Sequence, residues 1–238
     1  MLKVALTKGR VEEQVIPLLE RCGIDCEPIR NKKRKLILQL GDVLEVILVK
    51  GDDVLTYLNN GVVDLGIVGS DVLHEQQHPG HELMDLETGR CRFILASTAD
   101  YDPNMARRPI IGKKYPVITQ EYFRSRGMDV EIIEIKGSVE LAPLVGLADA
   151  IVDITETGTT LRENNLQIYD ELEWISTRLV VNSLSLKQKK QEILTLMNCL
   201  QKAVDEVKAE KKAASEAAKA AAQAATSGRI DTPAKAVK

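Results

Sequence analysis

Residues 150–161 of the chain are AIVDITETGTTL, an apolar run that leads into a turn rich in Thr and Gly. The run from Ala150 to Ile154 predicts a buried β-strand, and the residues after Gly158 predict a helix. A strand that passes through a short turn into a helix is the repeating unit of α/β domains. This stretch is therefore typical of an α/β fold.

The same turn predicts a phosphate site. Gly158 lets the backbone approach an anion, and the start of a helix directs free N–H groups toward it. The carboxylates of Asp153 and Glu156 suit ribose hydroxyls or a magnesium ion, so the turn favours a sugar phosphate. An ordinary capped turn between strand and helix is the alternative, and the residues alone leave it open. The candidate phosphate-binding groups are the backbone at Gly158 and the hydroxyls of Thr155, Thr157, Thr159 and Thr160, whereas Asp153 and Glu156 would repel a phosphate.

A second strand-to-turn segment lies just before this one, at residues 136–143. It places Glu140 in the first turn of an expected helix, which repeats the layout of an acid beside a turn. The alternative is that Ser138 caps the helix and that Glu140 only interacts favourably with the helix dipole.

Positive charges follow two further strand candidates. Lys8 and Arg10 flank Gly9 where the first strand is expected to end, and Lys50 follows a strand expected at residues 43–49. Open α/β sheets bind ligands at the carboxyl ends of their strands. These three cations are therefore candidates for binding a polyphosphate.

Short β-rich runs alternate with helical patterns from residue 2 to about residue 182, which predicts an α/β fold with mainly parallel strands. They fall into two groups, which predict two α/β lobes. The expected first lobe comprises residues 1–88 plus about 183–207, and the second comprises residues 89–182. The expected strands cover residues 2–7, 36–40, 43–49, 63–68, 91–97, 110–112, 130–136 and 150–154.

The end of the chain differs in composition from the rest. Residues 187–207 carry an apolar stripe with helical spacing, whereas residues 208–238 are rich in Ala and Lys and have little to bury. We expect this tail to be a solvated helical extension or disordered. The alternatives are a segment that binds a partner and a segment added to the natural chain.

Composition argues against several classes of function. The chain has 238 residues, of which 32 are basic, 35 acidic and 3% aromatic, so we expect no binding to nucleic acid or to a membrane. It shows neither a signal peptide nor an apolar run that could cross a bilayer, and we expect it in the cytoplasm. Its four Cys residues are scattered, and we expect them to be reduced.

Residues 74–78, HEQQH, match the H-E-x-x-H pattern of zinc peptidases. Pro79 and Gly80 follow directly and would end a helix there. The third histidine, His81, is too close to fit the extended spacing of that class. We therefore expect these histidines in a surface loop and keep a metallopeptidase as a distant alternative.

Six segments form an ordered pattern: TKGR (7–10), VDLGIVGSD (63–71), GRCRF (89–93), GSVELAP (137–143), LADAIVD (147–153) and TGTTL (157–161). Together they resemble the ATP phosphoribosyltransferases, which join ATP to phosphoribosyl pyrophosphate at the entry to histidine biosynthesis. The resemblance covers about residues 1–205. It implies two lobes arranged like a type II periplasmic binding protein, an active site in the cleft, and Mg²⁺ bound through the substrates rather than by protein ligands alone.

The resemblance also implies roles for single residues. Lys8, Arg10 and Lys50 are expected to act as catalytic residues on the pyrophosphate and triphosphate charges, and the Lys50 position is often Arg in the family. Glu140 and Asp153 are expected to bind ribose hydroxyls, and residues 156–160 the 5′-phosphate. The expected wall of the ATP site comprises Asp64, Gly66, Gly69 and Asp71.

The family has long members with a regulatory domain that binds histidine, and short members without it. This chain resembles the short kind, which needs a regulatory subunit related to histidyl-tRNA synthetase, usually in a hetero-octamer. That partner is therefore implied here. The rival hypothesis is a solute-binding module without turnover, because a fold alone does not determine function.

Overall fold

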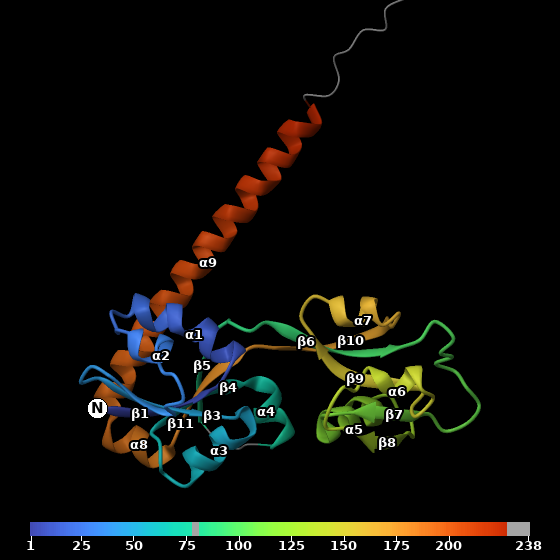
Figure 1. The fold of residues 1–238 in the computed structure, drawn as a ribbon, viewed down its shortest axis with the longest axis horizontal. Coiled ribbons are helices and arrows are strands. Elements are labelled where there is room, and N and C mark those ends of the chain that lie inside the picture. Colours follow the sequence, from blue (N-terminus) through green and yellow to red (C-terminus); the bar gives the residue numbers. More distant parts are fainter. Residues whose placement is uncertain (78–80, 228–238) are drawn as a thin grey trace, which may run out of the picture.

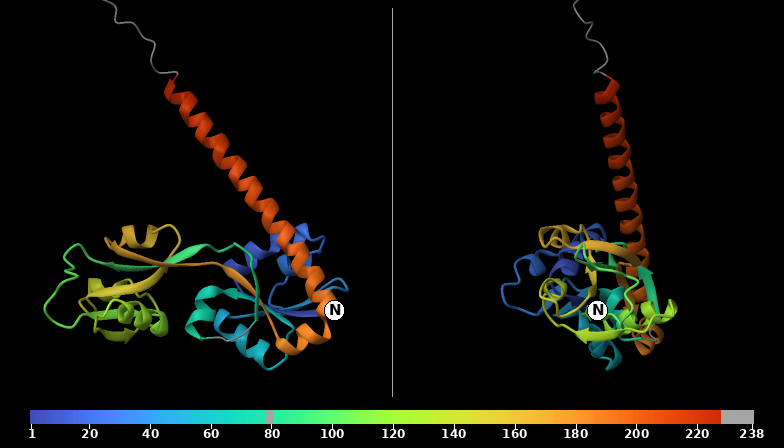
Figure 2. Two further views of the ribbon diagram at one scale, coloured as in Figure 1. Left: turned by 180° about the vertical axis from the view of Figure 1, so that it is seen from behind. Right: turned by 90° about the vertical axis from the view of Figure 1, so that its right-hand side faces the viewer.

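The computed structural model describes residues 1–77 and 81–227, which form two lobes side by side, each with one mixed β-sheet (Figure 1). The predicted α/β class is confirmed. One long helix leaves the body of the molecule and projects away from it, as the two further views in Figure 2 also show.

Lobe I contains a six-stranded sheet. Its strands, in sheet order, are β2 (Ile37–Leu40), β3 (Leu44–Val49), β1 (Leu2–Thr7), β4 (Leu65–Gly69), β11 (Thr177–Val181) and β5 (His81–Asp85). Its helices are α1 (Arg10–Arg21), α2 (Glu27–Arg30), α3 (Gly51–Asn59), α4 (Ser70–Glu75), α8 (Ser183–Gln188) and α9 (Lys190–Ser227).

Lobe II contains a five-stranded sheet. Its strands, in sheet order, are β10 (Gln167–Ile175), β6 (Cys91–Ser97), β9 (Ala150–Thr155), β7 (Ile110–Lys113) and β8 (Glu131–Glu134). Its helices are α5 (Pro116–Ser125), α6 (Leu141–Leu144) and α7 (Thr159–Glu163).

The sequence of β1 is apolar almost throughout because helices cover both faces of the lobe I sheet. Val4 and Leu6 belong to the core that α1 and α9 cover, whereas Ala5 belongs to the core beneath α3. A strand with only one buried face would alternate apolar and polar residues instead. The apolar run that predicted β1 therefore reflects the burial of this strand on both faces of the sheet.

The prediction of mainly parallel strands is wrong. β1 pairs in parallel with β3 and β4, and β7 pairs in parallel with β8 and β9. The other five pairings are antiparallel, because β2 and β3 form a hairpin and because β5, β6, β10 and β11 carry the chain between the lobes. Of these four crossing strands, only β6 was predicted.

The chain crosses between the lobes twice. It enters lobe II between β5 and β6 and returns at Ser176, between β10 and β11. The predicted return after Asn182 is therefore too late. The physical reason is that β11 completes the lobe I sheet, where Thr177 to Val181 pair with the whole length of β4.

Helix α9 confirms the predicted helical extension as far as Ser227, while the disorder predicted for its far end falls on residues 228–238, outside the described residues. Ile193, Leu200 and Val204 bury the first part of α9 against lobe I. Arg21 forms ion pairs with two glutamates of the next turns. The described residues contain no helix with the length and apolarity needed to cross a bilayer.

Shortening the chain after Lys212 is expected to keep the free energy of unfolding within about 0.5 kcal/mol of that of the full chain, because residues 213–218 are exposed and exposed residues away from packed contacts contribute little. Urea unfolding followed by circular dichroism measures this difference. Leu200→Ala serves as the control, because Leu200 is fully buried in the same helix and its truncation should cost about 2–5 kcal/mol. A shortened chain that lost more than about 1 kcal/mol would contradict the expectation.

Candidate functional site

The edge of lobe I that faces lobe II is formed by the carboxyl ends of β3, β1 and β4, which run in the same direction. Lys8 and Arg10 follow β1, Lys50 follows β3, and Asp71 follows β4. Gly9 makes the connection from β1 to α1 with a φ of 82°, a backbone region that favours glycine. The structure thus brings the three predicted cations to one edge of a sheet.

The facing edge of lobe II is built in the same way, from the carboxyl ends of β7, β8 and β9. The turn after β9 carries the predicted phosphate residues, and Glu140 lies at the start of α6 after β8. Glu140 occupies the N-cap position of α6, so the alternative in which Ser138 caps this helix is wrong.

The turn between β9 and α7 is organised by its own hydroxyl groups. Gly158 has a φ of 70°, and its N–H donates to Thr155 Oγ1 at 2.9 Å. The Oγ1 atoms of Thr157 and Thr159 lie 2.9 Å apart. Arg162 reaches back over the turn and donates to Thr157 O at 3.0 Å and to Thr159 Oγ1 at 3.1 Å.

Arg162 was not predicted from the sequence. Its position four residues after Gly158, within the first turn of a helix, was a usable signal, because residues at this spacing lie on one face. Its guanidinium supplies a positive charge that the threonines of the turn lack.

An ion pair between Arg10 and Glu156 joins the two edges. Arg10 Nη1 lies 2.8 Å from Glu156 Oε2, and both side chains are about half exposed. The buried Cys91 lies close by: burial raises the pKa of its thiol to about 11, and the nearby Arg10 charge opposes this rise. The contact therefore brings a predicted pyrophosphate residue to the predicted phosphate turn.

Two carboxyl groups lie deep in this region. Burial raises the pKa of Asp153, and the negative charge of Glu140 adds to the rise. Burial likewise raises the pKa of Asp71, whose Oδ2 accepts a hydrogen bond from Tyr115 Oη at 3.2 Å. The charge of Lys114 opposes both shifts.

Lys114 is a second cation that sequence reasoning missed. It follows β7 just as Lys8 follows β1, but β7 has only four residues, and too short a run was predicted there to mark its end. Its influence on both Asp71 and Asp153 places it near predicted residues from both lobes.

The structure removes two residues from the predicted wall of the ATP site. Asp64 lies at the opposite end of β4 from Gly69, where its carboxylate accepts from Lys3 N at 2.8 Å, Ser185 Oγ at 2.7 Å and Lys189 Nζ at 2.7 Å. This carboxylate therefore ties α8 and the start of α9 to the sheet. Gly69 and Asp71 stay at the facing edge.

Gly66 also has a structural role, which depends on close packing rather than on hydrogen bonds. A Cβ atom at Gly66 would lie 2.8 Å from Val54 Cγ1 and 2.9 Å from Val180 Cγ2. Glycine is therefore required so that α3 can approach the sheet closely.

The H-E-x-x-H segment does not form a surface loop throughout. His74 and Glu75 lie in α4, and His78 lies outside the described residues. Within residues 1–77 and 81–227 there is no group of three or more His, Cys, Asp or Glu that could hold a metal ion. His74 instead contacts two glutamates of lobe II.

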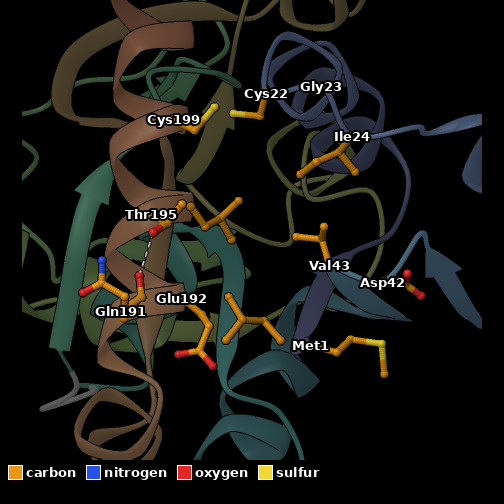
Figure 3. A pocket seen from close by; sticks show the side chains of 12 residues that line it. Met1, Cys22, Gly23, Ile24, Asp42, Val43, Gln191, Glu192, Thr195 and Cys199 are labelled. Carbon is orange, nitrogen blue, oxygen red and sulfur yellow. Dashed lines mark hydrogen bonds between the residues drawn. The ribbon is translucent and has the colours of Figure 1, made fainter.

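An apolar pocket of about 410 Å³ lies at the other end of lobe I (Figure 3). It is lined by Met1 and Leu2, at the start of β1, and by one face of α9. The six residues of β1 separate it from Lys8 by about 20 Å. Cys22 and Cys199 point toward each other at its rim, and all four cysteines are free, as predicted. The pocket therefore lies far from the facing edges.

Comparison of sequences gives one consistent family. The family model described as HisG, ATP phosphoribosyltransferase, matches residues 50–202. An ATP phosphoribosyltransferase of Lactiplantibacillus plantarum is 62% identical over 205 residues, which cover 86% of this chain and 94% of that protein. One of Listeria monocytogenes is 53% identical over 210 residues, which cover 88% and 99%.

Comparison with solved structures gives the same family. A chain of the ATP phosphoribosyl transferase (HisG:HisZ) complex from Thermotoga maritima has a TM-score of 0.74 and 38% identity, covering 87% of this chain and 100% of that one. The periplasmic aliphatic sulphonate binding protein SsuA from Escherichia coli has a TM-score of 0.57 at 12% identity, covering 89% and 75%. The second match shows a shared fold and confirms the predicted likeness to periplasmic binding proteins.

Replacing Asp64 by Asn is expected to destabilise the fold by about 2 kcal/mol near neutral pH, because it weakens hydrogen bonds to a charged group. Burial opposes ionisation of Asp64, but the bonds from Lys189, Lys3 and Ser185 outweigh it and hold its pKa below the usual range. This stabilisation is therefore present above the pKa of an unfolded Asp, about 3.9, and is lost as the pH falls through the lower folded value.

Urea unfolding of both proteins at pH 7 and at about pH 3 measures this loss. Asp42→Asn, in the exposed hairpin turn between β2 and β3, is the matched control and should change little. A difference between Asp64→Asn and the parent protein that stayed constant with pH would contradict the assignment.

Proposed function

The chain belongs to the ATP phosphoribosyltransferase family, and from this premise we propose that its active site forms where the carboxyl-terminal edges of the two sheets face each other. The protein is a pentosyltransferase that joins ATP to phosphoribosyl pyrophosphate in the first step of histidine biosynthesis. The observation that carries the location is the Arg10–Glu156 contact, which brings the two charged edges within 2.8 Å of each other.

Phosphoribosyl pyrophosphate binds to lobe II in this proposal. The 5′-phosphate accepts hydrogen bonds from the hydroxyls and backbone of residues 157–160, and Arg162 adds a positive charge. The ribose hydroxyls donate to Asp153 and Glu140. Burial raises the pKa of Asp153, so this carboxyl group is partly shielded from solvent at the place where the ribose is proposed to bind.

ATP binds to lobe I in this proposal. Gly69 and Asp71 form the wall of the nucleotide site, and Lys8 and Lys50 face the triphosphate from the ends of β1 and β3. Lys50 provides a point charge rather than the bidentate contact of an arginine. Asp64 and Gly66 take no part, because their surroundings give both a structural role.

Transfer requires N1 of adenine to attack the anomeric carbon while pyrophosphate leaves, through a transition state with oxocarbenium character. The residues named above hold the two polyanions in line and neutralise negative charge on the leaving group, so no protein nucleophile is needed. Arg10 meets the pyrophosphate by exchanging its contact with Glu156 for one with phosphate oxygen, since an exposed ion pair is weak enough to be displaced.

Mg²⁺ enters with the substrates in this proposal. Phosphate oxygens supply most of its ligands, and the nearest carboxylates are those of Asp153, with Glu140 beside it, and of Asp71, which like Asp153 lies near Lys114. The ion supplies charge neutralisation at the leaving pyrophosphate.

We further propose that the protein works with a regulatory subunit in the cytoplasm. The Thermotoga maritima structure is of a HisG:HisZ complex, and its HisG-like chain is covered in full by this one. The proposed partner is a HisZ-type subunit related to histidyl-tRNA synthetase, in a hetero-octamer.

Arg10→Ala and Lys8→Ala are each expected to lower kcat/KM by about 10²- to 10³-fold, because each removes a charge aimed at the leaving pyrophosphate. Pyrophosphate release from ATP, phosphoribosyl pyrophosphate and Mg²⁺, with the ultraviolet change of N1-modified adenine, measures the rate with and without the regulatory subunit. His81→Gln, at the exposed first residue of β5, is the control. Full activity of both alanine variants would exclude these roles, and ligand binding without turnover by the parent protein would support a solute-binding module instead.

Chelation of Mg²⁺ is expected to stop turnover while leaving the unfolding temperature of the ligand-free chain unchanged, because the ion is held through substrate phosphates. Thermal unfolding with and without EDTA, beside an activity assay restored by added Mg²⁺, measures both effects. An unfolding temperature that dropped on adding EDTA would indicate a metal ion bound by the protein itself.

A further inference from the structure

Helix α4 presents three polar side chains to lobe II. Asp71, His74 and Glu75 are spaced i, i+3 and i+4, which puts them on one face of the helix. Figure 1 shows α4 on the side of lobe I that faces α5 of lobe II. The polar face of α4 is therefore directed at the other lobe.

Glu75 caps a helix of the other lobe. Its Oε1 accepts from Val117 N at 3.0 Å, and its Oε2 accepts from Val117 N at 3.1 Å and from Ile118 N at 3.2 Å. These are N–H groups of the first turn of α5, which have no partner within their own helix. A carboxylate at a helix N-terminus also interacts favourably with the helix dipole. One lobe thus satisfies backbone donors of the other.

His74 makes a second connection. Its Nδ1 lies 2.6 Å from Glu173 Oε1 on β10, and its Nε2 lies 2.6 Å from Glu121 Oε2 on α5. A neutral imidazole can donate from only one nitrogen, so it is the doubly protonated ring that can donate to both glutamates when these are ionised. Burial opposes that charge, but the hydrogen bond to Glu121 and the charge of Glu173 outweigh it and raise the pKa of His74.

The other charged and titratable groups around His74 are largely matched among themselves. On α5, Tyr122 and Arg126 both bond to Asp170. On the lobe I side, Arg178 pairs with Glu82 and Asp85. The remaining acids of α4 are Asp71 and Glu75, which contact Tyr115 and the start of α5.

Because these neighbouring groups already have partners, His74 is the group of α4 that contacts both Glu121 and Glu173.

These contacts act on the part of lobe II that carries the site. Helix α5 begins directly after Tyr115, next to Lys114, at the carboxyl end of β7. A displacement of α5 would therefore move this edge of lobe II relative to Lys8 and Arg10. Lobes joined by two crossings are expected to rotate about them unless further contacts hold them.

We propose that α4 is an interlobe clasp in which Glu75 and His74 are positioning residues, holding lobe II in the orientation where residues 156–160 face Lys8 and Arg10. The catalytic consequence rests on the proposed location of the active site. The clasp itself does not, because its hydrogen bonds can be observed without turnover.

Amide hydrogen exchange of the full chain tests the clasp directly. Glu75→Ala should speed exchange of the Val117 and Ile118 amides by about tenfold, the effect of losing a hydrogen bond to a charged acceptor. Thr119 N, which bonds to Tyr115 O within lobe II, is the internal control and should be unchanged if α5 stays folded. Glu75→Gln keeps an acceptor and should restore part of the protection. Unchanged exchange at Val117 and Ile118 in Glu75→Ala would overturn the proposal.

Kinetics test the consequence. His74→Gln should lower kcat/KM about tenfold at low pH, which is less than the effect of Arg10→Ala. The reason is that it shifts lobe II relative to the charges of Lys8 and Arg10 without removing either charge. Since the folded pKa of His74 is raised, the His74 contacts of the clasp are complete below that pKa and are lost as the pH rises through it, while the Glu75 hydrogen bonds remain. The parent protein and His74→Gln should therefore converge at alkaline pH, whereas His81→Gln should follow the parent at every pH.

Equal kcat/KM for His74→Gln and the parent across the pH range would overturn the positioning role. If the parent protein showed no turnover at all, the proposed function would fail instead, and the exchange of Val117 and Ile118 would still decide whether the clasp exists.

Discussion

The structure depends on where the chain crosses between its two sheets. The crossing strands are neighbours on both sides: β5 pairs with β11 in lobe I, and β6 pairs with β10 in lobe II. The two connections therefore run together as a narrow two-stranded link. Such a link resists separation of the lobes but resists bending much less, so polar contacts such as Arg10–Glu156 and those of α4 set the angle between them.

The sequence predicted the parts of the fold that are governed by local patterns. Strands with buried faces, such as β1 and β9, were found because their burial shows directly as apolar residues. β10 was missed because its exposed positions carry charged and polar residues that hide the strand pattern. The return crossing was misplaced for a related reason, since membership of β11 in the first sheet depends on pairing with β4, which is distant in sequence.

The site shows the same division. Glycines and cations after predicted strands were placed at the facing edges, because parallel strands bring their carboxyl ends together. Asp64 and Gly66 lie in the same segment as Asp71 but serve packing, and only three-dimensional contacts distinguish them. His74 and Glu75 matched a zinc pattern because one helical face can serve either a metal or a neighbouring helix. Residue spacing shows which side chains share a helix face, but not whether that face binds a metal ion or packs against another helix.

Helix α9 also affects how the protein moves in solution. Its 38 residues span about 57 Å, and the part beyond Lys212, about 22 Å long, projects away from the body of lobe I (Figure 1). Friction depends on the longest dimension of a particle more than on its mass, so this chain of 26.3 kDa should elute from a sizing column ahead of compact proteins of equal mass. The number of subunits in its assemblies is therefore better obtained from light scattering or sedimentation equilibrium, which report mass independently of shape.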